Sequence, residues 1–146
     1  MEDISVDLAK TYGVTTSHSR MDNGELRFRL LSTDGSAYVR VEATTDSGWQ
    51  NSHYHRTILE TYILQKEWAG FAELEDGKVT CRIMRPGDVY TTRPGISHNV
   101  YLPADAVIHT VKHGGPTEEN DWHSDELLNS KTKHMSEEQI LRGQWH

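Results

Sequence analysis

The chain has 146 residues, enough for one domain with a hydrophobic core and too few for two domains of ordinary size. Its 15 basic and 22 acidic residues give a formal net charge of −7 without any basic cluster, so nucleic acids and anionic membranes are poor candidate partners. Hydrophobic residues make up only 35% of the chain, which is low but compatible with a small β domain.

The apolar segments and the cysteine content of the chain indicate the cellular compartment of the protein. No apolar run approaches the roughly 20 residues of a transmembrane helix. The first residues, Met1 to Ser5, are acidic and lack the core of a signal peptide. Cys81 is the only cysteine, so an internal disulfide is impossible, and we expect a buried, inert thiol. These features favour a cytoplasmic protein.

Short alternating segments fill most of the chain. Residues 1–24 are polar and mixed, and we expect an N-terminal arm or a first edge strand there. From Glu25 on, polar and apolar residues alternate as they do in half-buried strands. The segments expected as strands are, in chain order, 25–31, 38–43, 53–55, 61–64, 70–74, 79–84, 89–92, 98–102 and 106–112. Turn residues separate them, among them an Asp76-Gly77 hairpin signal. Many short strands with frequent turns predict an all-β barrel or sandwich over residues 25–113.

The last part of the chain has a different pattern. Gly114-Gly115-Pro116 ends the series of strands, and two short helices are expected at 124–128 and 136–141. The second carries a capping box from Ser136 to Gln139. Residues 114–146 are too few for a domain, so we expect a C-terminal helical extension that packs on the barrel or on a second subunit.

Four residues point to a metal site. His53 and His55 are two apart, which places both imidazoles on one face of a strand. After a turn Glu60 can return to the same point, and His98 can reach it from a distant strand. Three imidazoles and one carboxylate suit one divalent transition metal, such as Fe, Mn, Ni, Zn, Co or Cu. Ligands from one side leave coordination positions open for water or substrate.

Two further residues are candidates for proton transfer. Tyr62 follows Glu60 by two and should share its face, either as a core tyrosine or as a phenol that donates to substrate. His109 lies either at the surface or inside the barrel as an acid or base, since a histidine titrates near pH ~6.5. Lys112 alternates out of phase with His109, so we expect it in solvent.

Arginine and tryptophan supply candidates for substrate binding. Arg27, Arg29 and Arg40 lie on strands whose apolar residues occupy the opposite faces. They either face solvent or point inward, where they would bind carboxylate or phosphate. Trp49 is either a packing residue or a platform for a sugar ring at the mouth. We single out Arg27, Arg40 and Trp49 as the substrate-binding candidates.

The order of these residues resembles the two motifs of the cupin superfamily over roughly residues 36–113. In the first motif His-x-His is followed by Glu, as at His53, His55 and Glu60; in the second, Gly87, Gly95 and His98 match in register. The departures leave all four ligand positions intact: Gly48 is one position late, Glu67 stands where a glycine is usual, Arg93 replaces a proline that is shifted to 94, and Leu102 replaces an asparagine. The resemblance implies a double-stranded β-helix (jelly-roll) barrel with a metal near one mouth.

The cupin fold hosts many activities, so three functions stay open. The first is a metal-dependent isomerase, epimerase or lyase acting on a small polar, sugar-like molecule, in which a metal stabilises an enediolate while His109 or Tyr62 moves the proton. The second is an Fe(II)-dependent dioxygenase, and the third is a non-catalytic module that binds a small molecule or metal. Small cupins often pair their sheets across a dimer, so we expect a homodimer.

Overall fold

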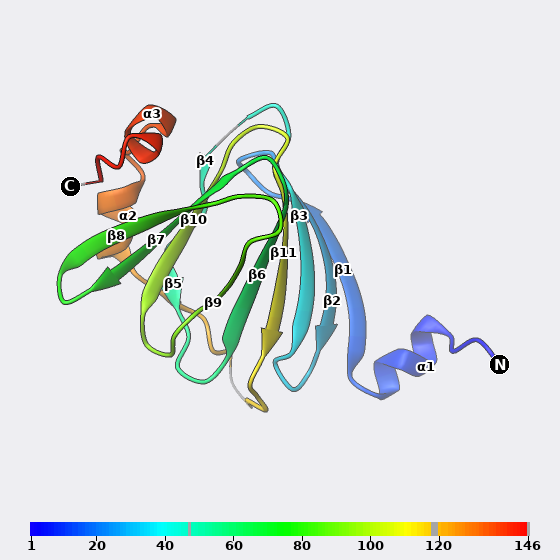
Figure 1. The fold of residues 1–146 in the computed structure, drawn as a ribbon. Helices are drawn as coiled ribbons and strands as arrows, with labels where there is room; N and C mark the ends of the chain where they lie inside the picture. The colour runs from blue at the N-terminus through cyan, green and yellow to red at the C-terminus, as the bar shows by residue number, and fades with distance from the viewer. Residues whose placement is uncertain (47, 118–119, 146) are drawn as a thin grey trace.

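The computed structural model describes residues 1–46, 48–117 and 120–145. Its strands form two antiparallel sheets that curve toward each other as a barrel (Figure 1). The first sheet contains, in spatial order, β1 (Val14–Arg20), β2 (Leu26–Ser32), β3 (Ala37–Glu42), β11 (Val107–His113), β6 (Leu59–Lys66) and β9 (Val89–Thr91). The second contains β12 (His123–Ser124), β5 (His53–Tyr54), β10 (Ser97–Leu102), β7 (Ala69–Glu75) and β8 (Lys78–Met84), with β4 (Gly48–Trp49) paired to β10. The expected jelly-roll class is confirmed.

The β7–β8 hairpin shows how local sequence produces this sheet. Asp76 and Gly77 both have positive φ, 51° and 75°, which a tight two-residue hairpin turn requires. Glu75 and Lys78 therefore become register partners, as the Asp-Gly signal indicates.

Strand alternation divides the barrel interior into a polar end and an apolar end. Along β6, Glu60 and Tyr62 and then Leu64 point inward and are buried. On the neighbouring β11, Lys112 pairs with Glu60 and Thr110 pairs with Tyr62. The apolar end is a core of buried residues that includes Val41, Leu64, Phe71, Met84, Leu102 and Ile108. The core therefore supports one end of the barrel and leaves the other end polar.

The N-terminal residues partly extend the first sheet. Val14–Arg20 pairs with β2 along its whole length. Of the two alternatives for the N-terminal residues, an arm or a first edge strand, this segment therefore forms the edge strand. Before it, α1 (Val6–Thr11) projects from the barrel and contains no buried residue (Figure 1). Ser5 caps this helix by accepting a hydrogen bond from the Leu8 backbone N–H.

The C-terminal extension lies on the outer face of the second sheet. α2 (Glu126–Thr132) contacts β10 and β7, and α3 (Glu137–Leu141) contacts β8. The first helix begins later than expected because Asp125 caps it and Ser124 belongs to β12. The expected capping box of Ser136 and Gln139 is present at α3. Residues 118–119 and 146 of the expected extension lie outside the described ranges.

Close packing under α3 depends on a residue without a side chain. A Cβ placed on Gly70 would lie 3.1 Å from the Ile140 side chain, and Ile140 is fully buried. Cys81 belongs to the same cluster, and burial raises the pKa of its thiol to about 11, so it stays protonated.

Within the described ranges, no helix combines the length and the apolar character needed to cross a membrane. The cytoplasmic location stays a prediction.

Candidate metal centre

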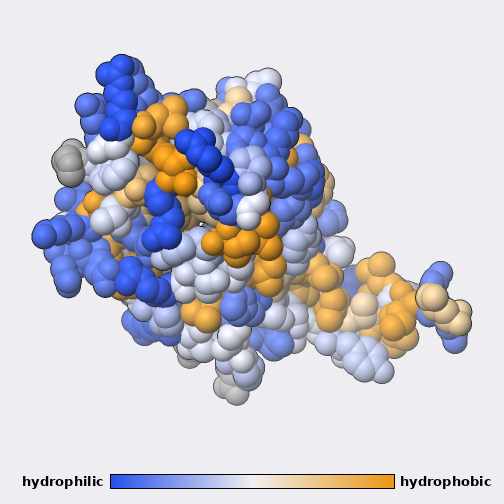
Figure 2. Space-filling model, in the orientation of Figure 1, coloured by the Kyte–Doolittle hydropathy of each residue, from blue (hydrophilic) through white to orange (hydrophobic). Residues whose placement is uncertain are grey.

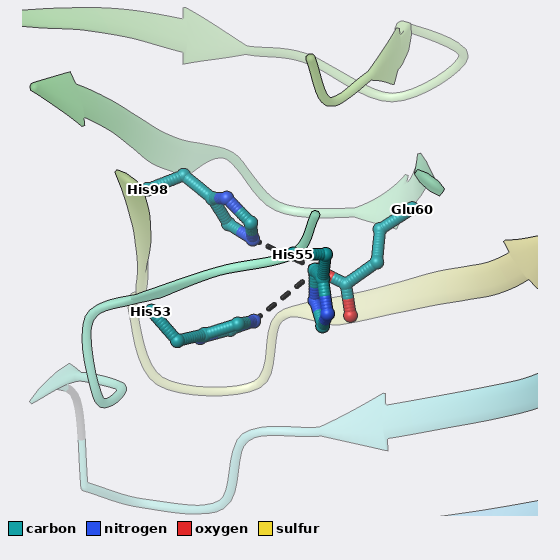
Figure 3. Close-up of side chains that lie close together, drawn as sticks. All are labelled: His53, His55, Glu60 and His98. Atoms are coloured by element: carbon teal, nitrogen blue, oxygen red, sulfur yellow. Dashed lines mark hydrogen bonds and ion pairs between the residues drawn. The ribbon is translucent and has the colours of Figure 1, made fainter. Parts of the chain in front are cut away.

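The four predicted ligands converge at the polar end of the barrel. His53 on β5 and His98 on β10 are register partners, Glu60 comes from β6, and His55 lies just after β5. Figure 3 shows the three imidazoles pointing toward the Glu60 carboxylate. Their ligand atoms all lie within 4.8 Å of one another, and all four residues are buried. Local strand alternation brings each side chain inward, and the pairing of β5 with β10 brings the two motifs together.

A single carboxylate oxygen is the meeting point of the cluster. Glu60 Oε2 lies 3.3 Å from His53 Nε2, 3.2 Å from His55 Nε2 and 2.8 Å from His98 Nε2. Three ring nitrogens around one oxygen at these distances need positive charge between them, because lone pairs facing each other repel.

The opposite ring nitrogens show how each imidazole is oriented. His53 Nδ1 lies 2.9 Å from the Asn51 carbonyl oxygen, His98 Nδ1 lies 3.3 Å from that of Ile96, and His55 Nδ1 contacts that of Asp121. A carbonyl oxygen only accepts, so Nδ1 carries the proton in each ring. In the neutral rings Nε2 then presents a lone pair to the cluster, as metal-binding histidines do. The buried His55 Nε2 makes no hydrogen bond. These donors fit a divalent metal.

Two side chains hold the Glu60 carboxylate from the inner sheet face. The Tyr62 hydroxyl donates to Oε2 at 2.8 Å, and Lys112 Nζ lies 3.5 Å from Oε1. Burial by itself raises the pKa of Glu60, but when Nε2 of the three histidines carries a proton, its donation to the carboxylate outweighs burial and holds that pKa well below the usual range. Burial and the negative Glu60 raise the pKa of Tyr62 well above its ordinary value, so the phenol stays protonated.

A segment far along the chain supports the site from outside. The Asp121 carboxylate accepts hydrogen bonds from the backbone N–H groups of Arg56, Thr57 and Ile58, at 2.8, 2.7 and 2.7 Å. These residues form the loop between His55 and Glu60. Burial alone raises the pKa of Asp121, but the three N–H groups and His123 lower it to about 2. Sequence reasoning missed this residue, because nothing in its local pattern points to a loop more than sixty residues away.

Trp122, next to Asp121, stacks on the His53 ring at a centroid distance of 5.3 Å. It lines a half-open cavity of about 100 Å³ above the ligands. The other residues around this cavity are Arg27, Arg29, Val39, Val41, Gln50, His53, Glu60, Tyr62, Thr110 and Lys112. Tyr62 and Arg27 therefore line this cavity, which is the inward alternative considered for each, and their roles toward a substrate stay predictions.

Other expected site residues lie elsewhere. His109 is on the outer sheet face, hydrogen bonded to Tyr38 and Gln65, so of its two alternatives the structure shows the surface one, and the interior acid or base is wrong. Arg40 is also outside, paired with Glu42 at 3.1 Å. In an antiparallel pair, register partners share a face, and His109 pairs with Arg40 whereas Lys112 pairs with Glu60. Lys112 therefore points inward, and the expectation that it lies in solvent is wrong.

Trp49 is the third displaced candidate. It packs edge-on against Tyr101 and donates its indole N–H to the Met135 carbonyl oxygen at 3.1 Å, beneath the C-terminal extension. The tryptophan at the mouth is Trp122 instead.

Comparisons with known proteins relate the chain to others by fold. No protein-family model and no curated protein sequence matches it. Among solved structures, oxalate decarboxylase from Bacillus subtilis is similar with a TM-score of 0.61 and 17% identity, over 87% of this chain and 34% of that chain. KdgF from a Halomonas species is similar with a TM-score of 0.53 and 16% identity, over 69% of this chain and 86% of that one. Drosophila melanogaster CENP-C bound to CAL1 has a TM-score of 0.52 and 13% identity, over 67% and 76%.

The chain thus spans about a third of the length of the oxalate decarboxylase that it matches. At these identities the similarity is one of fold, and oxalate decarboxylase and KdgF are cupins.

Proposed function

Since this chain has the cupin fold with the metal-binding residues of that fold in place, we propose that it is a metal-dependent enzyme acting on a small polar, sugar-like substrate by isomerase, epimerase or lyase chemistry. The observation that carries the proposal is the convergence of three buried imidazole nitrogens and one carboxylate beneath a half-open cavity. A purely structural cluster has no need of such an opening.

The metal is expected to be one divalent transition ion held by His53, His55, Glu60 and His98. Manganese is the first ion to test, because Mn(II) centres are named for the oxalate decarboxylase of Bacillus subtilis. A divalent ion in such a site supplies Lewis acidity to the substrate oxygens that it binds.

The residues of the chain would orient the substrate and move protons. Lys112 stands at the cavity with its Nζ near Glu60 Oε1, so we propose it as the group that exchanges a proton with substrate. Tyr62, which stays protonated and donates to Glu60, is proposed as a positioning residue for that ligand. His109 is not proposed as a base because it lies on the other face of the sheet.

The decisive experiment is metal analysis combined with activity. We expect about one divalent ion per chain in the purified protein, and His53→Ala with His98→Ala should remove it. The matched control is His109→Ala with His113→Ala: His109 bonds Tyr38 and Gln65, and His113 bonds Thr61 at 2.8 Å, outside the cavity. Full metal retention in the first double variant would refute the proposal.

Turnover then separates the reaction classes. Metal-dependent conversion of a sugar-like substrate without oxygen uptake supports the proposal. Iron-dependent oxygen uptake would indicate the dioxygenase instead, and tight metal binding without turnover of any polyol, aldose or ketose would indicate a binding module.

We also propose a homodimer. The outer face of the first sheet exposes Phe28, Leu30 and Tyr38, and α1 exposes Val6 and Leu8. Figure 2 shows hydrophobic atoms gathered along the projecting N-terminal segment. Apolar surface of this kind is commonly covered by a partner.

A further inference from the structure

The cavity above the ligands is positively charged although the chain is negative. Three of its lining side chains are cationic, namely Arg27, Arg29 and Lys112, and one, Glu60, is a carboxylate. The whole chain has a formal charge of −7. A bound divalent metal would increase the positive charge further, so the cavity favours an anion.

Two of the three cations already have carboxylate partners. Arg27 donates to Glu25 Oε2 at 3.0 and 3.3 Å, and Gln50 also donates to this buried glutamate. Lys112 lies beside Glu60. A carboxylate already offsets the charge of each of these two side chains, so both attract an anionic substrate less than an unpaired cation does.

Arg29 has no such partner. Among the described residues no carboxylate lies within ion-pair distance of it. Its guanidinium donates to the Ser19 hydroxyl at 2.7 Å and contacts the Met21 sulfur at 3.7 Å. A guanidinium has five N–H donors, so most of them remain for a ligand. Burial, and then repulsion from Arg27, lower the pKa of Arg29, as expected for a cation without a counterion.

The sheet register places Arg29 beside the site. Arg29 pairs with Val39, Val39 with Thr110, and Thr110 with Tyr62, so all four side chains lie on the inner face in one row. Three strand spacings of about 4.8 Å separate the backbones of β2 and β6, which is about 14 Å before curvature. A ligand that joins Arg29 to the metal ligands therefore extends over several atoms.

From this placement we propose that Arg29 binds the carboxylate of a polyhydroxy-acid substrate whose oxygens at the other end reach the metal centre. The proposal deepens the proposed function and rests on it for the second contact. The guanidinium matches a carboxylate with two parallel N–H···O bonds. Trp122, at the mouth, covers the carbon chain between the two ends. A phosphate group is the competing anion, and the small cavity favours the smaller carboxylate.

Binding of matched probes to the metal-loaded protein tests this. The pairs are D-glucuronate beside D-glucose and D-gluconate beside D-glucitol, with D-glucose 6-phosphate as the phosphate probe. Titration calorimetry should show that at least one acid binds at least roughly tenfold more tightly than its uncharged counterpart. Arg29→Met should weaken binding of that acid roughly 10- to 100-fold and leave the uncharged probe unaffected.

The matched control is Arg40→Met, which removes the same charge from the outer face of the adjacent strand and should keep the preference. Arg29→Gln repeats the measurement should the methionine variant fail to fold. No preference for either acid in the wild type, a preference that survives both Arg29 variants, or tighter binding of the phosphate would each overturn the inference.

Metal content is measured separately on every sample. If the wild type binds no metal but still prefers the acids through Arg29, the proposed function is refuted and the carboxylate site is retained. A metal-loaded wild type without the preference would do the reverse.

Discussion

Asp121 offers the sharpest test of how the site is built, because it acts on a loop that it does not adjoin in sequence. Asp121→Asn keeps the shape of the side chain and leaves only one oxygen. In one orientation of the amide, that oxygen accepts from the N–H groups of Thr57 and Ile58; in the other, it accepts from that of Arg56. In either orientation the amide NH₂ faces the backbone N–H groups that remain, and these lose their acceptor. We expect the folded state to lose stability and the loop between His55 and Glu60 to loosen.

The magnitude follows from the pKa of Asp121, which is lowered from 3.8 to about 2. Each unit corresponds to about 1.4 kcal/mol, so ionised Asp121 contributes at most about 2.5 kcal/mol. Screening by nearby solvent reduces this to between about 1 and 2 kcal/mol. Because the folded-state pKa lies below the unfolded one, this stabilisation is present above about pH 4 and is lost as the pH falls toward 2.

Urea unfolding of the metal-free protein at pH 7 measures the change, and metal titration of the folded protein measures the effect on the site. We expect Asp121→Asn to lower the free energy of unfolding by about 1 to 2 kcal/mol and metal affinity by roughly tenfold. Asp88→Asn is the control, since Asp88 accepts one backbone N–H, from Arg85, in an exposed turn, and should change stability by about 0.5 kcal/mol or less. An Asp121→Asn variant with the stability and metal affinity of the wild type would refute this account of the loop.

Four further predictions concern the ligands and the assembly. Metal affinity should fall as the pH drops through about 6.5, because protons compete with the metal for the imidazoles. Burial lowers the pKa of His53, so protons compete for this ring only at a lower pH. A flat affinity between about pH 7.5 and about pH 5.5 would exclude histidine ligands. Glu60→Gln should weaken binding at every pH in that range while the pH slope persists. Tyr62→Phe removes the 2.8 Å hydrogen bond to Glu60 and should lower metal affinity up to about tenfold with the fold intact by circular dichroism; unchanged affinity would mean that Tyr62 does not position the ligand. Light scattering should give twice the monomer mass, and a monomer across a wide concentration range would contradict the dimer.

The metal cluster and the fold class were predictable from sequence because both depend on local rules. His53 and His55 share a face whatever surrounds them, since alternation in a strand is a property of the backbone. The Asp76-Gly77 turn is equally local, because its positive φ angles need residues that tolerate them. The order of ligands and glycines added the resemblance to cupins, and the observed fold agrees with it.

Which face of each strand points inward was decided only by tertiary structure. On β2, Arg27 and Arg29 line the cavity while Phe28 and Leu30 are exposed, the reverse of the usual preference. Alternation defines two faces but does not say which one meets the other sheet. At the start of β11, Val107 and Ile108 are both buried beside a register shift, so the apolar pattern gives no phase for the residues that follow.

Contacts between distant segments were equally beyond the reach of local pattern. Asp121 and Trp122 meet the site only because β12 pairs with β5 and carries residues from the far end of the chain to the mouth of the barrel. Local sequence thus determined which residues could bind a metal. Strand pairing and long-range packing determined which other side chains surround it, because those contacts depend on the whole fold rather than on near neighbours in the chain.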